Sequence, residues 1–152
     1  MELLSFSPRE TQKIAALLAG EIKKTKNRPA AAFVVGLEGN LGAGKTAFVQ
    51  GFARGLGLKH KITSPTFLIV RNYGLRSKNY GKFYHIDAYR IKKTRELVML
   101  GIKKILTDSK NIVVIEWADK MKRLLPPKTI WVELKPGRKE SERIISFSSR
   151  KK

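Results

Sequence analysis

The first part of the chain has an amphipathic pattern that predicts a helix followed by a buried strand. Ser7 to Glu10 reads as a capping box with proline at the first helical position. Apolar side chains then recur at helical spacing up to the basic segment Lys23 to Arg28: Ile14, Leu17, Leu18 and Ile22. Pro29 ends this region, and the continuous apolar run Ala30 to Leu37 is typical of a strand covered on both faces.

The remainder alternates between helical and strand-like patterns. Apolar positions from Phe48 to Leu56 mark one face of a second helix, and Gly55 and Gly57 suit its end. Two strand-like runs, Phe67 to Val70 and Phe83 to Ile86, are separated by the polar stretch Gly74 to Gly81 and predict an antiparallel hairpin. Further elements are expected as follows: a helix over Thr94 to Leu106, a strand over Asn111 to Glu116, a short helical stretch to Leu125 and strands over Ile130 to Leu134 and Ile144 to Phe147.

These patterns predict a single α/β domain. A chain of 152 residues has little surface to spare for a second core, and neither an internal repeat nor a long linker divides it. We expect the domain to cover residues 1–149, with residues 150–152 as a basic C-terminal tail. Its sheet should be mixed and mostly parallel, with one antiparallel hairpin and flanking helices.

Composition narrows the functional classes. Lys and Arg total 32 against 12 Asp and Glu, a formal net charge of +20, which favours an anionic partner: RNA, nucleotide phosphates or an acidic protein surface. The absence of cysteine excludes disulfides and thiolate zinc sites, and two histidines exclude a His-rich metal site. No apolar run approaches the roughly 20 residues of a membrane span, and no signal-peptide pattern is present, so we expect a cytoplasmic protein.

A phosphate-binding motif follows the buried strand. Gly39-Asn40-Leu41-Gly42-Ala43-Gly44-Lys45-Thr46 matches the P-loop pattern G-x-x-x-x-G-K-[ST] and stands between an expected strand and an expected helix. In such a loop, backbone N–H groups surround phosphate oxygens, Lys45 neutralises the β and γ phosphates, and the Thr46 hydroxyl is offered to Mg²⁺. A plain glycine turn is the structural alternative, and the flanking elements disfavour it.

Two carboxylates are candidates for the chemistry of a bound nucleotide. Glu116 closes a buried strand, where a P-loop protein places its Walker B acid, although the usual residue is Asp. Asp87 ends a hairpin strand and is a candidate for orienting water or a metal-bound water. Alternatively, Glu116 marks a solvent-facing strand end, and Asp87 caps a turn. Trp117 either packs beside the acid or contacts the ligand.

Two further groups of side chains have both a functional and a structural interpretation. Ser64-Pro65-Thr66 suits a nucleotide-sensing loop that reports the γ-phosphate to a partner, or an ordinary hydroxyl turn. Basic side chains around this segment suit RNA contacts or a solvated basic face: Lys59, His60, Lys61, Arg71, Arg76, Lys78 and Lys82.

Missing motifs exclude some P-loop classes. Without N-K-x-D and D-x-x-G elements a Ras-like GTPase is disfavoured, and no L-S-G-G-Q-like stretch supports a transport ATPase. Three functions remain: an ATPase, a small-molecule or nucleoside kinase in which Arg90 and Arg95 clamp phosphates, and an ATP-switched RNA-binding module.

Four segments together resemble the TsaE (YjeE) family of small bacterial P-loop ATPases, which act in forming threonylcarbamoyladenosine beside the anticodon of tRNA. They are Gly39 to Thr46, Ile62 to Phe67, Tyr84 to Arg90 and Ile115 to Asp119. The resemblance runs from about Thr11 to the closing strands. The P-loop is common to many families, but its combination with S-P-T-F, H-x-D-x-Y-R and I-E-W is specific.

The resemblance implies ATP and Mg²⁺ as cofactors and association with TsaD and TsaB proteins, whose complex the ATPase resets between turnovers. It also implies residue roles: Gly39 to Thr46 bind ATP, Thr46 and Glu116 serve Mg²⁺, Lys45, Asp87 and Glu116 support hydrolysis, Trp117 lies near the nucleotide, and Thr11 approaches its base. Contact with tRNA through the basic surface is a further expectation. Ala47 and Ala88 depart from the family pattern, and neither removes a proposed ligand.

Overall fold

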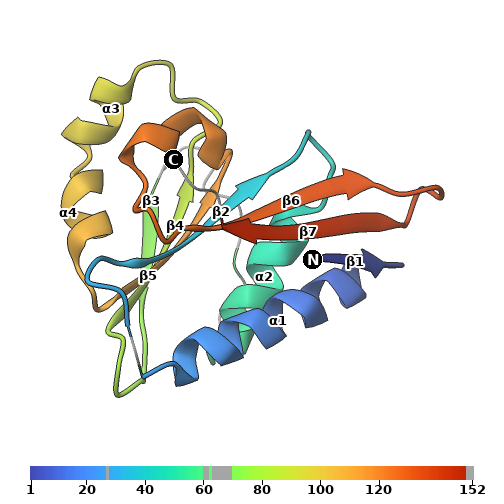
Figure 1. Ribbon diagram of the computed structural model, residues 1–152, viewed down its shortest axis with the longest axis horizontal. Helices are drawn as coiled ribbons and strands as arrows, with labels where there is room; N and C mark the ends of the chain where they lie inside the picture. Colours follow the sequence, from blue (N-terminus) through green and yellow to red (C-terminus); the bar gives the residue numbers. More distant parts are fainter. Residues whose placement is uncertain (27, 60–61, 63–69, 150–152) are drawn as a thin grey trace.

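The computed structural model describes residues 1–149 except 27, 60, 61 and 63–69 (Figure 1). Its elements are β1 Glu2–Ser5, α1 Pro8–Lys24, β2 Phe33–Glu38, α2 Lys45–Gly55, β3 Val70–Gly74, β4 Lys82–Asp87, α3 Thr94–Met99, α4 Ile102–Thr107, β5 Asn111–Glu116, the 3-10 helix η1 Ala118–Leu124, β6 Ile130–Pro136 and β7 Arg143–Ser149. The described strands form one sheet in the order β1-β7-β6-β2-β5-β4-β3.

The four central strands, β6, β2, β5 and β4, are parallel. β7 pairs antiparallel with β6, and β1 pairs antiparallel with β7 in turn, so β1 has the direction of the central strands. The other edge closes with β3 antiparallel to β4. The expected α/β fold with a mostly parallel sheet and an antiparallel hairpin is therefore confirmed.

Helices cover both faces of the sheet (Figure 1). Along β2, Val35 and Leu37 point to the face covered by α1 and α2, whereas Val34 points to the face covered by α3, α4 and η1. Phe48 and Phe52 of α2 fill the first core and are fully buried, each contributing about 1.5–3 kcal/mol. Burial on both faces explains why β2 and β5 read as continuous apolar runs.

The two helices on the first face lie unusually close together. A Cβ atom at Gly51 would come within 2.2 Å of the Gln12 carbonyl oxygen, and one at Gly55 within 2.4 Å of that of Ala16. These glycines of α2 thus permit backbone contact with α1. Because both contacts advance by the same four residues, the two helices run in the same direction.

The N-terminus of α1 agrees with its sequence pattern. Ser7 Oγ accepts a hydrogen bond from Glu10 N at 3.2 Å, and Glu10 Oε2 accepts one from Phe6 N at 2.7 Å. The first bond satisfies a backbone donor that a helix start leaves open, whereas the second holds Phe6, the residue before the N-cap, rather than Ser7 itself. At its other end α1 stops at Lys24, before most of the basic segment.

Three local expectations differ from the structure. Strand β1 was not predicted, because four residues at an edge show no periodicity without their partner β7. The helix expected over Thr94 to Leu106 is divided into α3 and α4, since Gly101 adopts a left-handed conformation with φ 73°. The first hairpin strand is described from Val70 and extends to Gly74, into the expected loop; residues 67–69 lie outside the described part.

The expected tail, residues 150–152, also lies outside the described residues. Within the described part of the chain, no helix combines the length and apolar character that crossing a membrane requires.

Candidate nucleotide-binding site

The P-loop motif joins the carboxyl end of β2 to the amino end of α2, as its sequence context requires. Three glycines of the loop have positive φ: 150° at Gly39, 80° at Gly42 and 102° at Gly44. A Cβ at Gly39 would lie 2.7 Å from the Leu134 carbonyl oxygen, so this position excludes a side chain. The loop thus turns sharply against β6 before α2 begins.

The P-loop residues divide into an exposed rim and a buried base. Asn40, Leu41 and Gly42 are exposed, whereas Ala43 and Lys45 are buried. Thr46 lies exposed in the first turn of α2. Anions are favoured at this position because the first N–H groups of a helix have no partner within the helix.

Lys45 is held inside the loop by its own backbone. Its Nζ donates to the carbonyl oxygens of Gly39 and of Asn40, the latter at 3.0 Å. Nζ also lies 4.0 Å from the centre of the Trp117 ring. Burial lowers the pKa of the Lys45 ammonium, and the charges of Glu116 and Asp87 oppose this shift. A phosphate at the loop would replace the two carbonyls as the partner of this cation.

The structure brings both candidate acids to the same edge of the sheet. β4 and β5 are parallel and in register at Asp87 and Glu116, so the two carboxylates end neighbouring strands beside the P-loop strand. Glu116 is only 3% exposed, which excludes the alternative that it faces solvent. Burial raises the pKa of Asp87, and a hydrogen bond from its neighbour's backbone opposes the rise.

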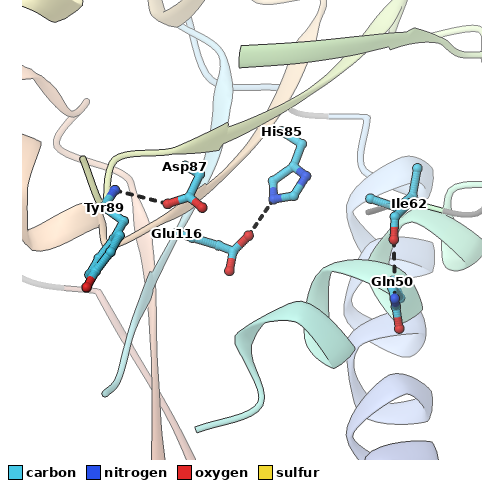
Figure 2. Close-up of polar contacts among 6 residues, drawn as sticks. All are labelled: Gln50, Ile62, His85, Asp87, Tyr89 and Glu116. Carbon is cyan, nitrogen blue, oxygen red and sulfur yellow. Dashed lines mark hydrogen bonds and ion pairs between the residues drawn. The ribbon is translucent and has the colours of Figure 1, made fainter. Parts of the chain in front are cut away.

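Asp87 also caps a turn, as its alternative interpretation expected. Its Oδ1 accepts a hydrogen bond from Tyr89 N at 3.0 Å (Figure 2). This bond fixes one oxygen of the carboxylate. The second oxygen remains available for chemistry, so the structural and the functional interpretation of Asp87 are compatible.

Sequence reasoning assigned no role to His85, which orients Glu116. The His85 Nε2 and Glu116 Oε2 atoms are 2.7 Å apart, and both residues are buried (Figure 2). His85 Nδ1 has no hydrogen-bond partner among the described residues. A histidine within a buried strand needs a polar partner, and this need is the sequence signal that could have drawn attention to His85.

An aromatic cluster covers the lysine. Trp117 follows Glu116 with a positive φ of 59°, and its ring centre lies 5.0 Å from that of Tyr89. Lys120 Nζ lies above both rings and donates to the Tyr89 carbonyl oxygen. Trp117 therefore packs beside the acid and also contacts the P-loop lysine.

Thr11 lies on the other side of the P-loop, in a pocket of about 570 Å³. Its hydroxyl is 2.7 Å from Ser5 Oγ, so it already has a hydrogen-bond partner. The pocket is lined by Pro8, Thr11, Gly44, Ala47, Lys139, Glu140, Ser141 and Arg143. A nucleoside attached to phosphates in the loop has room here.

Arg143 of β7 is a second residue that sequence reasoning missed. Its Nε donates to the Ala43 carbonyl oxygen at 3.1 Å, and its guanidinium donates to that of Gly42 at 3.0 Å. It also binds carbonyls of its own β6–β7 turn. Because 100 residues separate Arg143 from Ala43, no local motif could reveal this contact.

The donor set suits a magnesium ion held mainly by phosphate and water. The described residues contain no cluster of three or more His, Cys, Asp or Glu that would hold a metal by itself. Thr46 at the start of α2 and the strand-end carboxylates of Asp87 and Glu116 nevertheless lie around the loop. Mg²⁺ bound with nucleotide usually takes one or two protein ligands, so the residues fit.

The expected sensing segment Ser64-Pro65-Thr66 lies outside the described residues, as do His60 and Lys61. Gln50 Nε2 of α2 donates to the carbonyl oxygen of Ile62 at 3.2 Å (Figure 2). Gln50 Oε1 in turn accepts from Gln12 Nε2 at 3.1 Å. Ile62 is thereby attached to α2 through Gln50, which in turn is bonded to α1.

Comparisons with known proteins identify the family of the chain. The family model described as threonylcarbamoyl adenosine biosynthesis protein TsaE matches residues 5–145. The tRNA threonylcarbamoyladenosine biosynthesis protein TsaE of Bacillus subtilis is 34% identical over 145 residues, covering 95% of this chain and 83% of that protein. The protein of the same name from Rickettsia felis is 36% identical, covering 87% of this chain and 71% of its own.

A solved structure has the same fold. The crystal structure of Bacillus subtilis YdiB superposes with a TM-score of 0.72 at 31% identity, over 98% of this chain and 84% of that one. Fold and loop together define a P-loop α/β protein of the nucleotide-binding class. The chain belongs to the TsaE family of tRNA threonylcarbamoyladenosine biosynthesis proteins.

Proposed function

We propose that this chain is a Mg²⁺-dependent ATPase required for threonylcarbamoyladenosine modification of tRNA, acting in the cytoplasm with TsaB and TsaD proteins. The observation that carries the proposal is the convergence of Lys45, Glu116 and Asp87 at the P-loop. Family membership supplies the pathway. The enzymatic step is hydrolysis of the bond between the β and γ phosphates.

The P-loop binds and orients the triphosphate. Backbone N–H groups of Gly39 to Gly44 and the start of α2 receive phosphate oxygens, and Lys45 exchanges its carbonyl partners for the β and γ phosphates. Arg143 holds the Gly42 and Ala43 carbonyls away from the anion. The nucleoside then occupies the pocket that Thr11 and Ala47 line.

The strand-end acids carry out the remaining roles. Thr46 and Glu116 would hold Mg²⁺, which supplies charge neutralisation on the phosphates. His85 fixes the Glu116 carboxylate in one orientation. Asp87 accepts a hydrogen bond from the attacking water through the oxygen that its turn does not use.

Hydrolysis should be slow in the isolated protein. The rim residues Asn40, Leu41 and Gly42 are exposed, and no described segment covers them. P-loop sites reach full rate when a partner excludes water and adds positive charge to the transition state. The TsaB and TsaD proteins are the partners we propose for this step.

Nucleotide binding and phosphate release by Lys45→Ala and Glu116→Ala test the proposal. Lys45→Ala should weaken ATP binding at least about tenfold because it removes the cation of the loop, and Glu116→Ala should mainly lower the hydrolysis rate. Lys103→Ala, an exposed lysine of α4, is the control and should behave as wild type. Undiminished hydrolysis in both site variants would reject the assignment.

The same assay separates hydrolysis from phosphoryl transfer. An ATPase releases the γ-phosphate as free phosphate, whereas a kinase passes it to an acceptor hydroxyl. A labelled acceptor from a metabolite mixture, with little free phosphate, would instead support the kinase alternative.

A further inference from the structure

The end of the sheet opposite the P-loop, where the parallel strands have their amino ends, is formed by four segments that are distant in sequence. There the parallel strands begin and α1 and α2 end (Figure 1). Lys23 Nζ donates to the Leu56 carbonyl oxygen at 3.3 Å, and Gly81 N donates to that of Lys110 at 2.8 Å. The guanidinium of Arg28 donates to the Asn79 carbonyl oxygen. We call residues 20–26, 28, 56–59, 74–82 and 108–111 the basic edge.

Charge at the basic edge is strongly unbalanced. These segments contain nine lysines and arginines against two carboxylates, Glu21 and Asp108. None of the nine forms an ion pair with another described residue. Lys23 is half-buried, and the other eight are exposed: Lys24, Lys26, Arg28, Lys59, Arg76, Lys78, Lys82 and Lys110.

The acids of the chain are concentrated elsewhere. Glu38, Asp87 and Glu116 are the last residues of their strands and lie at the P-loop edge. Asp119 and Glu133 line a pocket beside the same loop. The basic edge therefore has few carboxylates to offset its cations.

The chemistry of the basic edge fits a phosphate backbone. It has a hollow of about 370 Å³ that is lined by three cations and no carboxylate: Lys23, Leu56, Gly57, Leu58, Lys59, Gly74 and Arg76. The exposed large apolar side chains of the described residues all lie outside it, so it lacks the aromatic or aliphatic anchors of a protein or membrane contact. Separate cations on a polar surface contact successive phosphates.

We propose that the basic edge binds the phosphate backbone of a folded RNA, with tRNA as the relevant class. The proposal rests on the proposed function only for the choice of tRNA. Because the nucleotide site lies at the opposite edge, RNA and ATP can be bound at the same time. Binding should be independent of base sequence and steeply dependent on salt.

A second basic surface provides a matched control. The α3–α4 face carries Lys92, Lys103 and Lys104, all exposed. It also exposes Val98, Met99 and Leu100, at 57%, 81% and 47%. Apolar side chains surrounded by charge are typical of a protein contact, so this face tests whether charge alone determines RNA binding.

The experiment compares two triple variants with equal change of charge. One is Lys59→Glu, Arg76→Glu and Lys82→Glu at the basic edge; the other is Lys92→Glu, Lys103→Glu and Lys104→Glu. Fluorescence anisotropy with labelled tRNA, from about 50 to 300 mM KCl, gives the affinity and its salt dependence. The edge variant should bind at least about tenfold more weakly, with a salt slope smaller by about two to three, whereas the control should stay within about twofold of wild type.

Three results would overturn the proposal: equal weakening by both triple variants, no measurable binding by wild type, or displacement of labelled tRNA by poly-glutamate that is more effective than by unlabelled tRNA at matched charge concentration. The last would identify an acidic protein as the partner. Binding of a fluorescent ATP analogue is measured in parallel and should be unchanged in both variants, which shows that they are folded. If wild type failed to bind ATP, the proposed function would fail while the tRNA result could still be interpreted.

Discussion

At the residue scale, the site depends on how buried polar groups are paired. Glu116 is almost completely buried, and a carboxylate in such a place needs a partner to offset its desolvation. His85 supplies that partner at 2.7 Å. The same contact that stabilises the fold also orients the acid for its proposed role.

Replacing His85 should therefore affect both stability and magnesium dependence. His85→Leu leaves the Glu116 carboxylate buried without its partner, which should cost about 1–3 kcal/mol of unfolding free energy. His85→Gln keeps an N–H donor and should recover much of both properties. The measurements are urea unfolding and the Mg²⁺ concentration that gives half-maximal ATP hydrolysis. A magnesium dependence that is equal in wild type, Leu and Gln variants would show that His85 has only a structural role.

The stability difference between wild type and Asp87→Asn should depend on pH. Burial raises its pKa in the folded protein, so its charged form costs stability, and this cost appears as pH rises through the folded pKa. Asp87→Asn keeps the acceptor for Tyr89 N but removes the charge. The variant should be slightly more stable than wild type at pH 7, and the difference should vanish below the pKa of an unfolded aspartate.

Unfolding free energies of both proteins at several pH values measure this difference. Phosphate release at neutral pH provides the functional comparison and should fall in Asp87→Asn. A variant that is less stable than wild type at pH 7 would contradict the desolvation argument.

At the scale of elements, the contact between α1 and α2 positions the pocket beside the P-loop. Gly51 faces the backbone of Gln12, and Thr11 is the adjacent residue of α1. If the two helices separate, the side of the pocket that Thr11 lines moves relative to the P-loop. Arg143 lines the same pocket and restrains the loop through the carbonyl oxygens of Gly42 and Ala43.

Gly51→Ala should separate these helices. Its Cβ would lie 2.2 Å from the Gln12 carbonyl oxygen, so backbone has to move, at a cost of about 1–3 kcal/mol or more. Gly20→Ala in α1 is the matched control, since nothing lies within 4 Å of its Cβ. The control should be stabilised by about 0.5–1 kcal/mol because alanine favours the helix. Thermal unfolding of both variants measures these changes in stability. A Gly51→Ala variant as stable as wild type would contradict the close contact between the helices.

At the scale of the whole molecule, the two edges of the sheet are chemically different. The P-loop edge combines the exposed loop rim with the carboxylates, and the opposite edge carries cations that form no ion pair with another described residue. This separation allows one small domain to present its nucleotide to one partner and its basic edge to another.

Capture by a TsaB–TsaD complex should depend on the nucleotide. A γ-phosphate at the exposed loop rim forms part of the surface that the partner contacts, so ATP with Mg²⁺ should favour capture over ADP or no nucleotide by at least about tenfold. Pull-down under the three conditions measures this preference. Lys45→Ala should lose the preference, whereas Lys103→Ala should keep it. Equal capture by wild type under all three conditions would contradict the proposal.

The sequence by itself determined the fold class and the location of the phosphate loop. Both are local properties: apolar runs at Ala30 to Leu37 and Asn111 to Glu116 reflect burial on two faces, and the glycines before Lys45 reflect backbone angles that other residues avoid. The acids Asp87 and Glu116 could be identified because they end such strands.

Only the tertiary structure decided what these residues contact. β1 exists because β7 lies beside it, His85 meets Glu116 because β4 and β5 are neighbours, and Arg143 reaches the loop across the sheet. Likewise, the basic edge assembles from four segments whose charges are scattered in sequence. Strand order is set by the packing of the whole chain, so contacts between distant segments leave no periodic signal in any one of them.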